Sequence, residues 1–241
     1  HSFGGIRDGK VSVGGLAHYS QIIKQAHKAG VHVVLAIGGW GVGGFSEASA
    51  TQQTRKVFID SIIEVIKTHR FDGIDIDWEY PTSTAGGLIT ASPADKQNFT
   101  FLLKELREAM DELNHDLILS VAVAAGAWAA ANYYEVAEMN KYIDYLHVMT
   151  YDLINYTTFN TTHHTNLLPS QFSNSSAQAG VNAYISRGMD KQKVVMGIAF
   201  YGHRFTTTSS GINGIGATTS ARGSVSYQDI VQNYLGNPLY N

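Results

Sequence analysis

The sequence has 241 residues, of which 44% are hydrophobic and 15% charged, and its formal net charge is −3 with a pI near 6.4. A balance so close to neutrality excludes the broad basic surface that binds nucleic acids or anionic membranes, so we expect neither partner. The absence of cysteine rules out disulfide bonds, thiolate catalysis and cysteine-based zinc sites.

Short apolar runs alternate with amphipathic segments along the chain, which is the pattern of a parallel sheet covered by helices. His1 to Gly4 is expected to be the end of one strand, and a helix with apolar residues at helical spacing runs from Leu16 to Ala26. A helix is also expected to start at the capping pattern 92–95. Buried strands are expected over residues 32–38, 73–78, 117–124, 143–150 and 194–200. This α/β pattern fits either a doubly wound sheet or a closed barrel.

A long polar segment rich in Thr, Asn and Ser spans residues 156–176, and loops of this length are often functional. It contains the adjacent pair His163 and His164. Because side chains of adjacent residues diverge and no third ligand stands at metal-binding spacing, we interpret both as solvated loop histidines.

The decisive segment is an acidic strand, Phe71-Asp-Gly-Ile-Asp-Ile-Asp-Trp-Glu-Tyr-Pro81. Side chains alternate along a strand, so Asp75, Asp77 and Glu79 face one side, with roughly 6–7 Å between successive acids. Carboxylates so close repel one another, which should keep a proton on part of the set, as a general acid requires. In a barrel, the three would line the axis and Glu79 would lie at the end where barrel enzymes are active.

Residues of this strand that face the opposite side have different predicted roles. Asp72 is expected to be structural at the strand entrance, and Trp78 is expected to pack in the core. Trp40, at the end of another strand, has equal claims to a sugar-stacking and a packing role, and Trp128 has a weaker claim of the same kind.

The acidic strand resembles the signature of glycoside hydrolase family 18, the chitinases and related endo-acting hexosaminidases. Three other segments agree in order. Ala36-Ile-Gly-Gly-Trp40 resembles the family's third-strand motif, with Ala36 replacing the usual serine, and Met149-Thr-Tyr-Asp152 resembles the motif that closes the sixth strand. Residues 197–202 resemble the seventh strand, except that His203 stands where arginine is common.

The resemblance implies a TIM (β/α)8 barrel in which the acidic strand is the fourth. Strands two to seven then lie in residues 1–205, a partial catalytic barrel, and residues 206–241 form the truncated start of an α+β insertion subdomain. A barrel without its first and last strands exposes two sheet edges, so we expect these 241 residues alone to be poorly soluble and inactive.

The reaction implied by the resemblance is retaining and substrate-assisted, without an enzyme nucleophile. Glu79 would donate the proton, while Asp77 would hold the attacking acetamido group and Asp75 would share a proton with Asp77. Tyr151 would fix the acetamido group by hydrogen bonding. The other residues expected to contact the sugar are Phe3, Trp40, Met149, Asp152 and Tyr201. No metal or cofactor is implied.

The favoured function is an endo-acting chitinase that cleaves β-1,4 N-acetylglucosamine linkages. An endo-β-N-acetylglucosaminidase acting on N-glycans and an inactive chitin-binding lectin remain open as alternatives. The motif Trp-Glu-Tyr-Pro favours the chitinase, and the presence of Glu79 and Asp77 disfavours the lectin. The substrate class predicts a secreted protein, and the full-length protein is expected to be a monomer.

Overall fold

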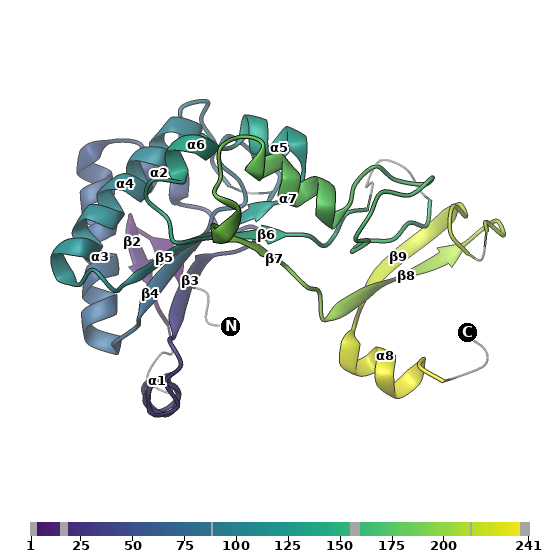
Figure 1. Ribbon diagram of the computed structural model, residues 1–241, viewed down its shortest axis with the longest axis horizontal. Coiled ribbons are helices and arrows are strands. Elements are labelled where there is room, and N and C mark those ends of the chain that lie inside the picture. Colours follow the sequence, from purple (N-terminus) through teal and green to yellow (C-terminus); the bar gives the residue numbers. More distant parts are fainter. Residues whose placement is uncertain (1–3, 15–18, 88, 155–159, 213, 237–241) are drawn as a thin grey trace.

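The computed structural model describes residues 4–14, 19–87, 89–154, 160–212 and 214–236. At its centre lies a parallel sheet in which each strand pairs with the next one along the chain (Figure 1). Its strands are β3 (Val34–Gly38), β4 (Gly73–Asp77), β5 (Ile118–Ala124), β6 (Tyr145–Met149) and β7 (Val194–Met196). Gly4 adds a parallel bridge to Ile37 of β3, as expected for the end of a preceding strand.

This strand order distinguishes the two architectures that periodicity left open. A doubly wound sheet reverses its order at a switch point, whereas a (β/α) barrel keeps sequential strands adjacent. The order β3-β4-β5-β6-β7 has no reversal, so the barrel prediction is confirmed. Within the described residues the strands form an open arc of that barrel.

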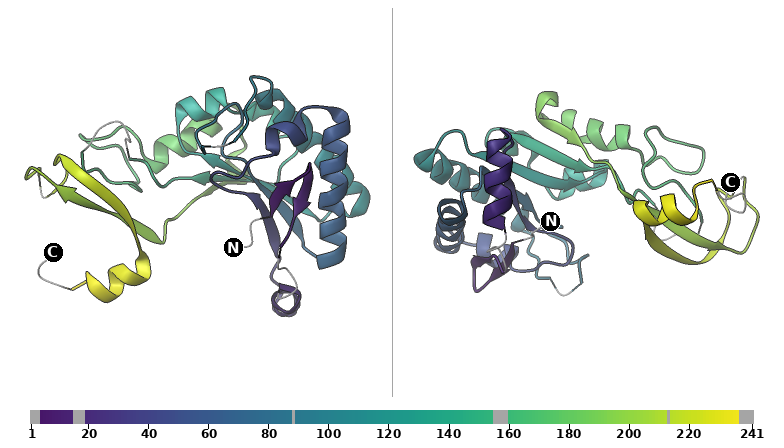
Figure 2. Two further views of the ribbon diagram at one scale, coloured as in Figure 1. Left: turned by 180° about the vertical axis from the view of Figure 1, so that it is seen from behind. Right: turned by 90° about the horizontal axis from the view of Figure 1, so that it is seen from below.

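Helices lie in every connection between these strands and pack beside the sheet (Figure 2). The helices in these connections are α2 (Phe45–Ser49), α3 (Gln52–His69), α4 (Asp95–Leu113), α5 (Ala127–Asn132), α6 (Val136–Met139) and α7 (Ala177–Ile185), with a 3-10 turn at Lys191–Lys193. Helix α1 (Tyr19–Lys28) precedes β3. No helix in the described part of the chain is long and apolar enough to cross a membrane.

The core lies between the sheet and its longest helices, α3 and α4. Ile74 and Ile76 of β4 are fully buried there. The buried side chains that α3 and α4 contribute to the same cluster include Phe58, Ile62, Phe99, Leu102 and Leu106. Trp78 is 2% exposed and stacks on Phe45, with 5.3 Å between the ring centroids. The prediction that Ile74, Ile76 and Trp78 face the core side of the acidic strand is therefore confirmed.

The start of α4 differs from the prediction. The helix begins at Asp95 rather than directly after Ser92, and its N-cap residue Ala94 makes no side-chain cap. Asp95 instead accepts hydrogen bonds from the backbone N–H of Ser92 at 2.7 Å and from the hydroxyl of Ser46 at 2.8 Å. Only the acidic half of the capping box forms, because the hydroxyl of Ser92 accepts from the backbone N–H of Ala94 at 3.2 Å and not from that of Asp95.

Asp72 has the structural role predicted from its parity. Its carboxylate accepts hydrogen bonds from the backbone N–H of Val33 at 2.6 Å and from Nε2 of His27 at 2.8 Å. Burial raises the pKa of Asp72, but these two donors outweigh it and the net shift is downward. Asp72 thus joins the entrance of β4 to α1 and to the residue before β3.

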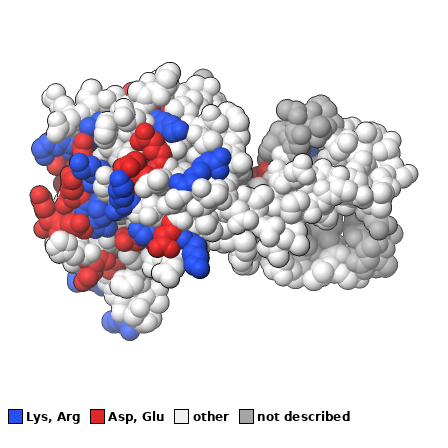
Figure 3. Space-filling view, turned by 45° about the horizontal axis from the view of Figure 1, so that its top comes forward, with Lys and Arg blue, Asp and Glu red and all other residues white. Residues whose placement is uncertain are grey.

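Two antiparallel hairpins flank the sheet, and neither was predicted. One pairs β1 (Gly5–Arg7) with β2 (Lys10–Ser12), and the other pairs β8 (Tyr201–Thr207) with β9 (Thr219–Ser226), which leads into α8 (Tyr227–Asn233). The second hairpin projects from the end of the sheet (Figures 1 and 2). In Figure 3 the charged side chains gather over the sheet and its helices, and the part that carries the hairpin shows few.

The strand expected over 194–200 is therefore wrong in its second half, because β7 ends at Met196. At Gly197 the chain passes too close to β6 for a side chain. A β-carbon there would lie 2.9 Å from the carbonyl oxygen of Val148 and 2.8 Å from the ring of Tyr151. Beyond this close approach the chain enters β8, which spans the residue 205/206 boundary expected between barrel and insertion.

Candidate active site

A cleft of about 1400 Å³ opens at the carboxyl ends of the parallel strands. Six of the residues predicted to act on substrate line it, namely Trp40, Asp77, Glu79, Met149, Tyr151 and Asp152. They end or follow three strands, β3, β4 and β6, whose carboxyl ends meet at one edge of a parallel sheet. Among the described residues, Asp75 and Tyr201 stand outside the lining, and Phe3 lies outside the described residues.

Asp75 is held below the cleft by a hydroxyl and an imidazole that sequence reasoning missed. The hydroxyl of Ser120 on β5 donates to its Oδ1 at 2.5 Å, and Nδ1 of His147 on β6 lies 3.1 Å from the same oxygen. The sheet register pairs Asp75 directly with Ser120. Strand alternation carried the signal, because Ser120 and His147 occupy the parity that faces the barrel axis.

Asp77 lies above Asp75 and is only 8% exposed. Its Oδ1 has no hydrogen-bond partner in the described part of the structure. Burial, together with the charges of Glu79 and Asp75, raises the pKa of Asp77 to about 7. This direction is the one predicted for the acidic strand, but burial contributes more to it than the crowding of acids that was expected to cause it.

Glycine is required beside Asp77 because the neighbouring strand approaches its backbone closely. Gly38, which ends β3, has φ of 118°, a conformation that residues with a side chain rarely adopt. A β-carbon at Gly38 would stand 2.0 Å from the carbonyl oxygen of Asp77, a direct collision. The same oxygen accepts a hydrogen bond from the backbone N–H of Gly39 at 2.8 Å. These contacts fix the height of Asp77 in the cleft.

Glu79 lines the cleft just beyond the end of β4. Burial raises its pKa; a hydrogen bond from the hydroxyl of Tyr80 opposes the rise, and the charge of Asp152 adds to it. Burial and the surrounding carboxylates raise the pKa of Tyr151 as well, so its hydroxyl keeps its hydrogen at neutral pH. The cleft therefore presents a carboxyl group with a raised pKa, Glu79, and a phenol that can donate a hydrogen bond, Tyr151.

A row of aromatic rings begins in the cleft lining with Trp40 and Tyr80 and continues beyond it to Tyr133 and Trp128. Tyr80 stacks on Tyr133 with 5.2 Å between centroids and 3° between planes. Trp40 meets the edge of Tyr80 at 6.3 Å, and Trp128 meets Tyr133 at 5.1 Å. Trp40 and Trp128 are 62% and 65% exposed, so their faces are available to a ligand rather than packed. Tyr80 and Tyr133 were missed because nothing in the local pattern predicts a contact between residues so far apart.

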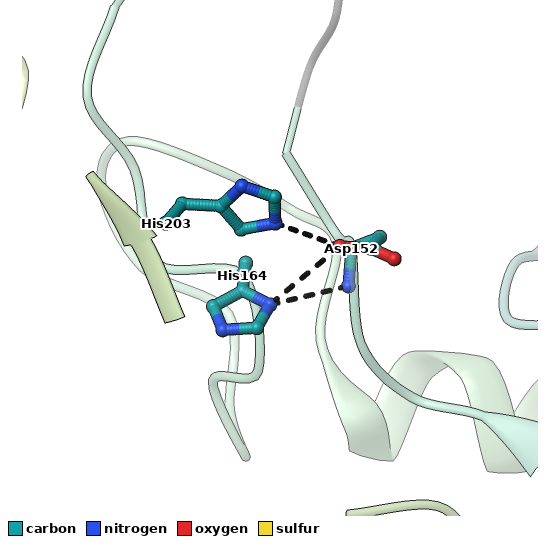
Figure 4. A group of neighbouring side chains, drawn as sticks. All are labelled: Asp152, His164 and His203. Atoms are coloured by element: carbon teal, nitrogen blue, oxygen red, sulfur yellow. Dashed lines mark hydrogen bonds and ion pairs between the residues drawn. The ribbon is translucent and has the colours of Figure 1, made fainter. Parts of the chain in front are cut away.

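Asp152 connects the cleft to the root of the second hairpin (Figure 4). The hydroxyl of Tyr201 donates to its Oδ2 at 2.6 Å, and Nε2 of His203 lies 2.7 Å from its Oδ1. His164 joins them with a side chain only 12% exposed, so the interpretation of His164 as a solvated loop histidine is wrong. Its neighbour His163 is exposed, as expected.

Comparison with known proteins agrees with this geometry. The family model of the glycosyl hydrolases family 18 matches residues 1–241. Probable chitinase 2 of Drosophila melanogaster is 34% identical over 86% of this chain, and Chitinase A1 of Niallia circulans is 31% identical over 86%. The chain spans 42% and 33% of the length of these two proteins.

Among solved structures, a glycoside hydrolase family 18 N-acetylglucosaminidase from Paenibacillus barengoltzii superposes with a TM-score of 0.90 at 31% identity. The match covers 98% of this chain and 72% of that one.

Proposed function

Because the chain belongs to glycosyl hydrolase family 18, we propose that the protein of which it forms part hydrolyses β-1,4 bonds between N-acetylglucosamine residues with retention. The observation that carries the proposal is the placement of Glu79, Asp77 and Tyr151 on the wall of one cleft. Apart from Asp77, Glu79 and Asp152, the described residues that line the cleft include no acidic or basic side chain, which suits an uncharged polysaccharide.

In the proposed reaction, Glu79 transfers its proton to the glycosidic oxygen as the bond to the leaving sugar breaks. The raised pKa of this carboxyl group supports the role, since a general acid must hold its proton near the working pH. The carbonyl oxygen of the substrate's own acetamido group attacks the anomeric carbon and forms an oxazolinium ion. Glu79, now a carboxylate, then takes a proton from the water that opens this ion.

Asp77 and Tyr151 act on the attacking acetamido group. Asp77 accepts a hydrogen bond from its N–H, for which the unpartnered Oδ1 is suited. The charge of Asp77 stabilises the cation as it forms, so this contact strengthens in the transition state. Tyr151 donates its hydroxyl to the acetamido oxygen and sets the angle of attack. Asp75, fixed by Ser120 and His147, exchanges a proton with Asp77 as the charge on the substrate changes.

Substrate contacts outside the reacting sugar follow from the cleft lining. We assign Trp40 to stacking against a sugar face and Met149 and Asp152 to the border of the reacting subsite, with Tyr201 holding Asp152 in place. We also propose that the protein acts outside the cell, because its polymeric substrate is extracellular. We propose in addition that it acts as a monomer.

A chitinase is favoured over an enzyme that removes single sugars, since the Drosophila and Niallia relatives are chitinases. The Paenibacillus neighbour is an N-acetylglucosaminidase, so exo action is the second candidate. The products released from chitohexaose distinguish endo action from exo action. The full-length protein should release a mixture of dimers and longer oligomers from chitohexaose, whereas exo action gives only monomer and pentamer at first. Cleavage of a high-mannose glycopeptide, without action on chitohexaose, would assign the N-glycan alternative.

The role of Glu79 is tested by Glu79→Gln, which preserves shape but cannot donate the proton. We expect kcat to fall by at least about 10²–10⁴-fold while calorimetric binding of chitohexaose is retained. The matched control is Glu112→Gln, which changes an exposed glutamate of α4. Activity of Glu79→Gln close to that of the control would remove Glu79 from the mechanism, and an inactive parent protein that binds chitin would establish the lectin.

A further inference from the structure

Three side chains from distant segments converge at the root of the second hairpin (Figure 4). Asp152 follows β6, His164 lies in the long polar loop and His203 lies on β8. Each offers one ligand atom, and these atoms lie within 4.8 Å of one another. Nε2 of His203 is 2.7 Å from Oδ1 of Asp152, and Nδ1 of His164 is 3.9 Å from the same oxygen.

The contacts of His164 leave one of its ring nitrogens with a lone pair that faces this centre. Its Nε2 lies 3.2 Å from the backbone carbonyl of Tyr201, which can only accept, so Nε2 carries the hydrogen. Nδ1 is then unprotonated and faces Asp152, whose backbone N–H reaches it weakly at 3.4 Å. A ring nitrogen bonded to a backbone carbonyl, with the other nitrogen unprotonated, is the usual arrangement of a metal-ligating histidine. Burial and the neighbouring His203 lower the pKa of His164, which keeps it in the neutral form that binds metal.

The carboxylate is oriented in the same way. The hydroxyl of Tyr201 occupies Oδ2 of Asp152 at 2.6 Å, which leaves Oδ1 toward both histidines. The side chains of His164 and His203 are 12% and 11% exposed, whereas that of Asp152 is 42% exposed. The centre is therefore enclosed on the imidazole side and open on one side, where an ion can enter and keep a water molecule.

We propose that Asp152, His164 and His203 form a binding site for a divalent transition-metal ion, of which Zn²⁺ fits best. Two imidazoles and one carboxylate are a ligand set that Zn²⁺ takes at about 2.0–2.2 Å, with a fourth position for water. Ligand atoms around a tetrahedral Zn²⁺ are roughly 3.3 Å apart. The two histidine nitrogens lie 2.7 and 3.9 Å from Oδ1 of Asp152, on either side of this value. All three ligand atoms lie within 4.8 Å of one another, so shifts of up to about 1.5 Å would complete the site.

The bound ion joins the loop, the end of β6 and the hairpin at one point. This site goes beyond the proposed hydrolysis, which requires no metal, and its consequence is mechanical. Metal that binds the folded protein and not the unfolded chain raises the melting temperature in proportion to the logarithm of its concentration. The hairpin root is then held more firmly beside the cleft.

The test uses the full-length protein treated with a chelator and then titrated with ZnCl₂ in a calorimeter. One Zn²⁺ per chain should bind, the melting temperature should rise, and Co²⁺ should give visible ligand-field absorption. His164→Ala should weaken binding by more than the roughly 10–100-fold that loss of an outer-shell partner costs. His163→Ala is the matched control, because it removes the adjacent exposed histidine and should leave binding unchanged.

His203→Arg provides a second variant, which places a cation beside Asp152 yet offers no ligand. It should remain folded and fail to bind Zn²⁺, which separates loss of the site from loss of the fold. The proposal is overturned if no ion binds, if binding survives both His164→Ala and His203→Arg, or if His163→Ala abolishes it equally. Binding that survives all three variants would belong to surface histidines such as His32, which is 71% exposed.

Discussion

Replacing Asp77 by asparagine should make the protein more stable and less active at the same time. In the folded protein, burial raises the pKa of Asp77 from 3.8 to about 7. At about 1.4 kcal/mol per pKa unit, the fold opposes ionisation of this group by about 4 kcal/mol. Asparagine has nearly the same shape and carries no charge, so the variant escapes this cost.

The sign of the effect depends on pH. Above pH 3.8 the unfolded chain releases the proton of Asp77, but the folded protein keeps it until about pH 7. The folded state therefore binds more protons between these values, and the free energy of unfolding falls as pH rises through this window. The loss is complete above pH 7 and absent below pH 3.8. Asp77→Asn should match the parent protein near pH 4 and exceed it most at pH 8.

The melting temperature measures the difference directly. If about half of the 4 kcal/mol appears, the gap at pH 8 should be roughly 4–8 °C, at about 2–4 °C per kcal/mol for a domain of this size. Asp116→Asn serves as the control, because it neutralises an exposed aspartate. A gap that does not change between pH 4 and pH 8, or a variant less stable than the parent at pH 8, would refute the reasoning. Over the same range kcat of Asp77→Asn should stay far below that of the parent, because the transition-state contact is lost.

Three further outcomes are expected. Trp40→Ala should raise the KM for chitohexaose by roughly 5- to 150-fold, measured by initial rates, because loss of a stacking face costs about 1–3 kcal/mol. An unchanged KM would leave Trp40 outside the substrate path. Gly38→Ala should lower the melting temperature by several degrees, because its β-carbon would meet a carbonyl oxygen at 2.0 Å, and a stable variant would contradict the close approach. Asp72→Asn should cost about 1–3 kcal/mol of stability by urea unfolding without changing kcat. The lowered pKa of Asp72 means that its contribution is present above pH 3.8 and disappears as pH falls below it.

Sequence periodicity predicted the strands in which burial determines the order of apolar and polar residues. The apolar runs located all five parallel strands, and the alternation from Ile74 to Glu79 separated the core side from the cleft side. The hairpin of β8 and β9 escaped because its residues are mostly polar and half exposed, so no alternation marks the strands. Contacts between distant residues, such as Tyr80 with Tyr133 or His164 with His203, depend on how loops close over the barrel. No local pattern encodes that closure.

The three tryptophans of this chain occupy environments that differ sharply. Trp78 is sealed between aromatic rings in the core, whereas Trp40 and Trp128 stand in water beside the cleft. Intrinsic fluorescence should therefore contain a blue, iodide-resistant component from Trp78 and a red, quenchable component from the other two. An oligosaccharide that enters the cleft would shield the second component and leave the first untouched, whereas unfolding would shift the first to the red. One spectrum thus separates occupancy of the cleft from integrity of the core, without a label.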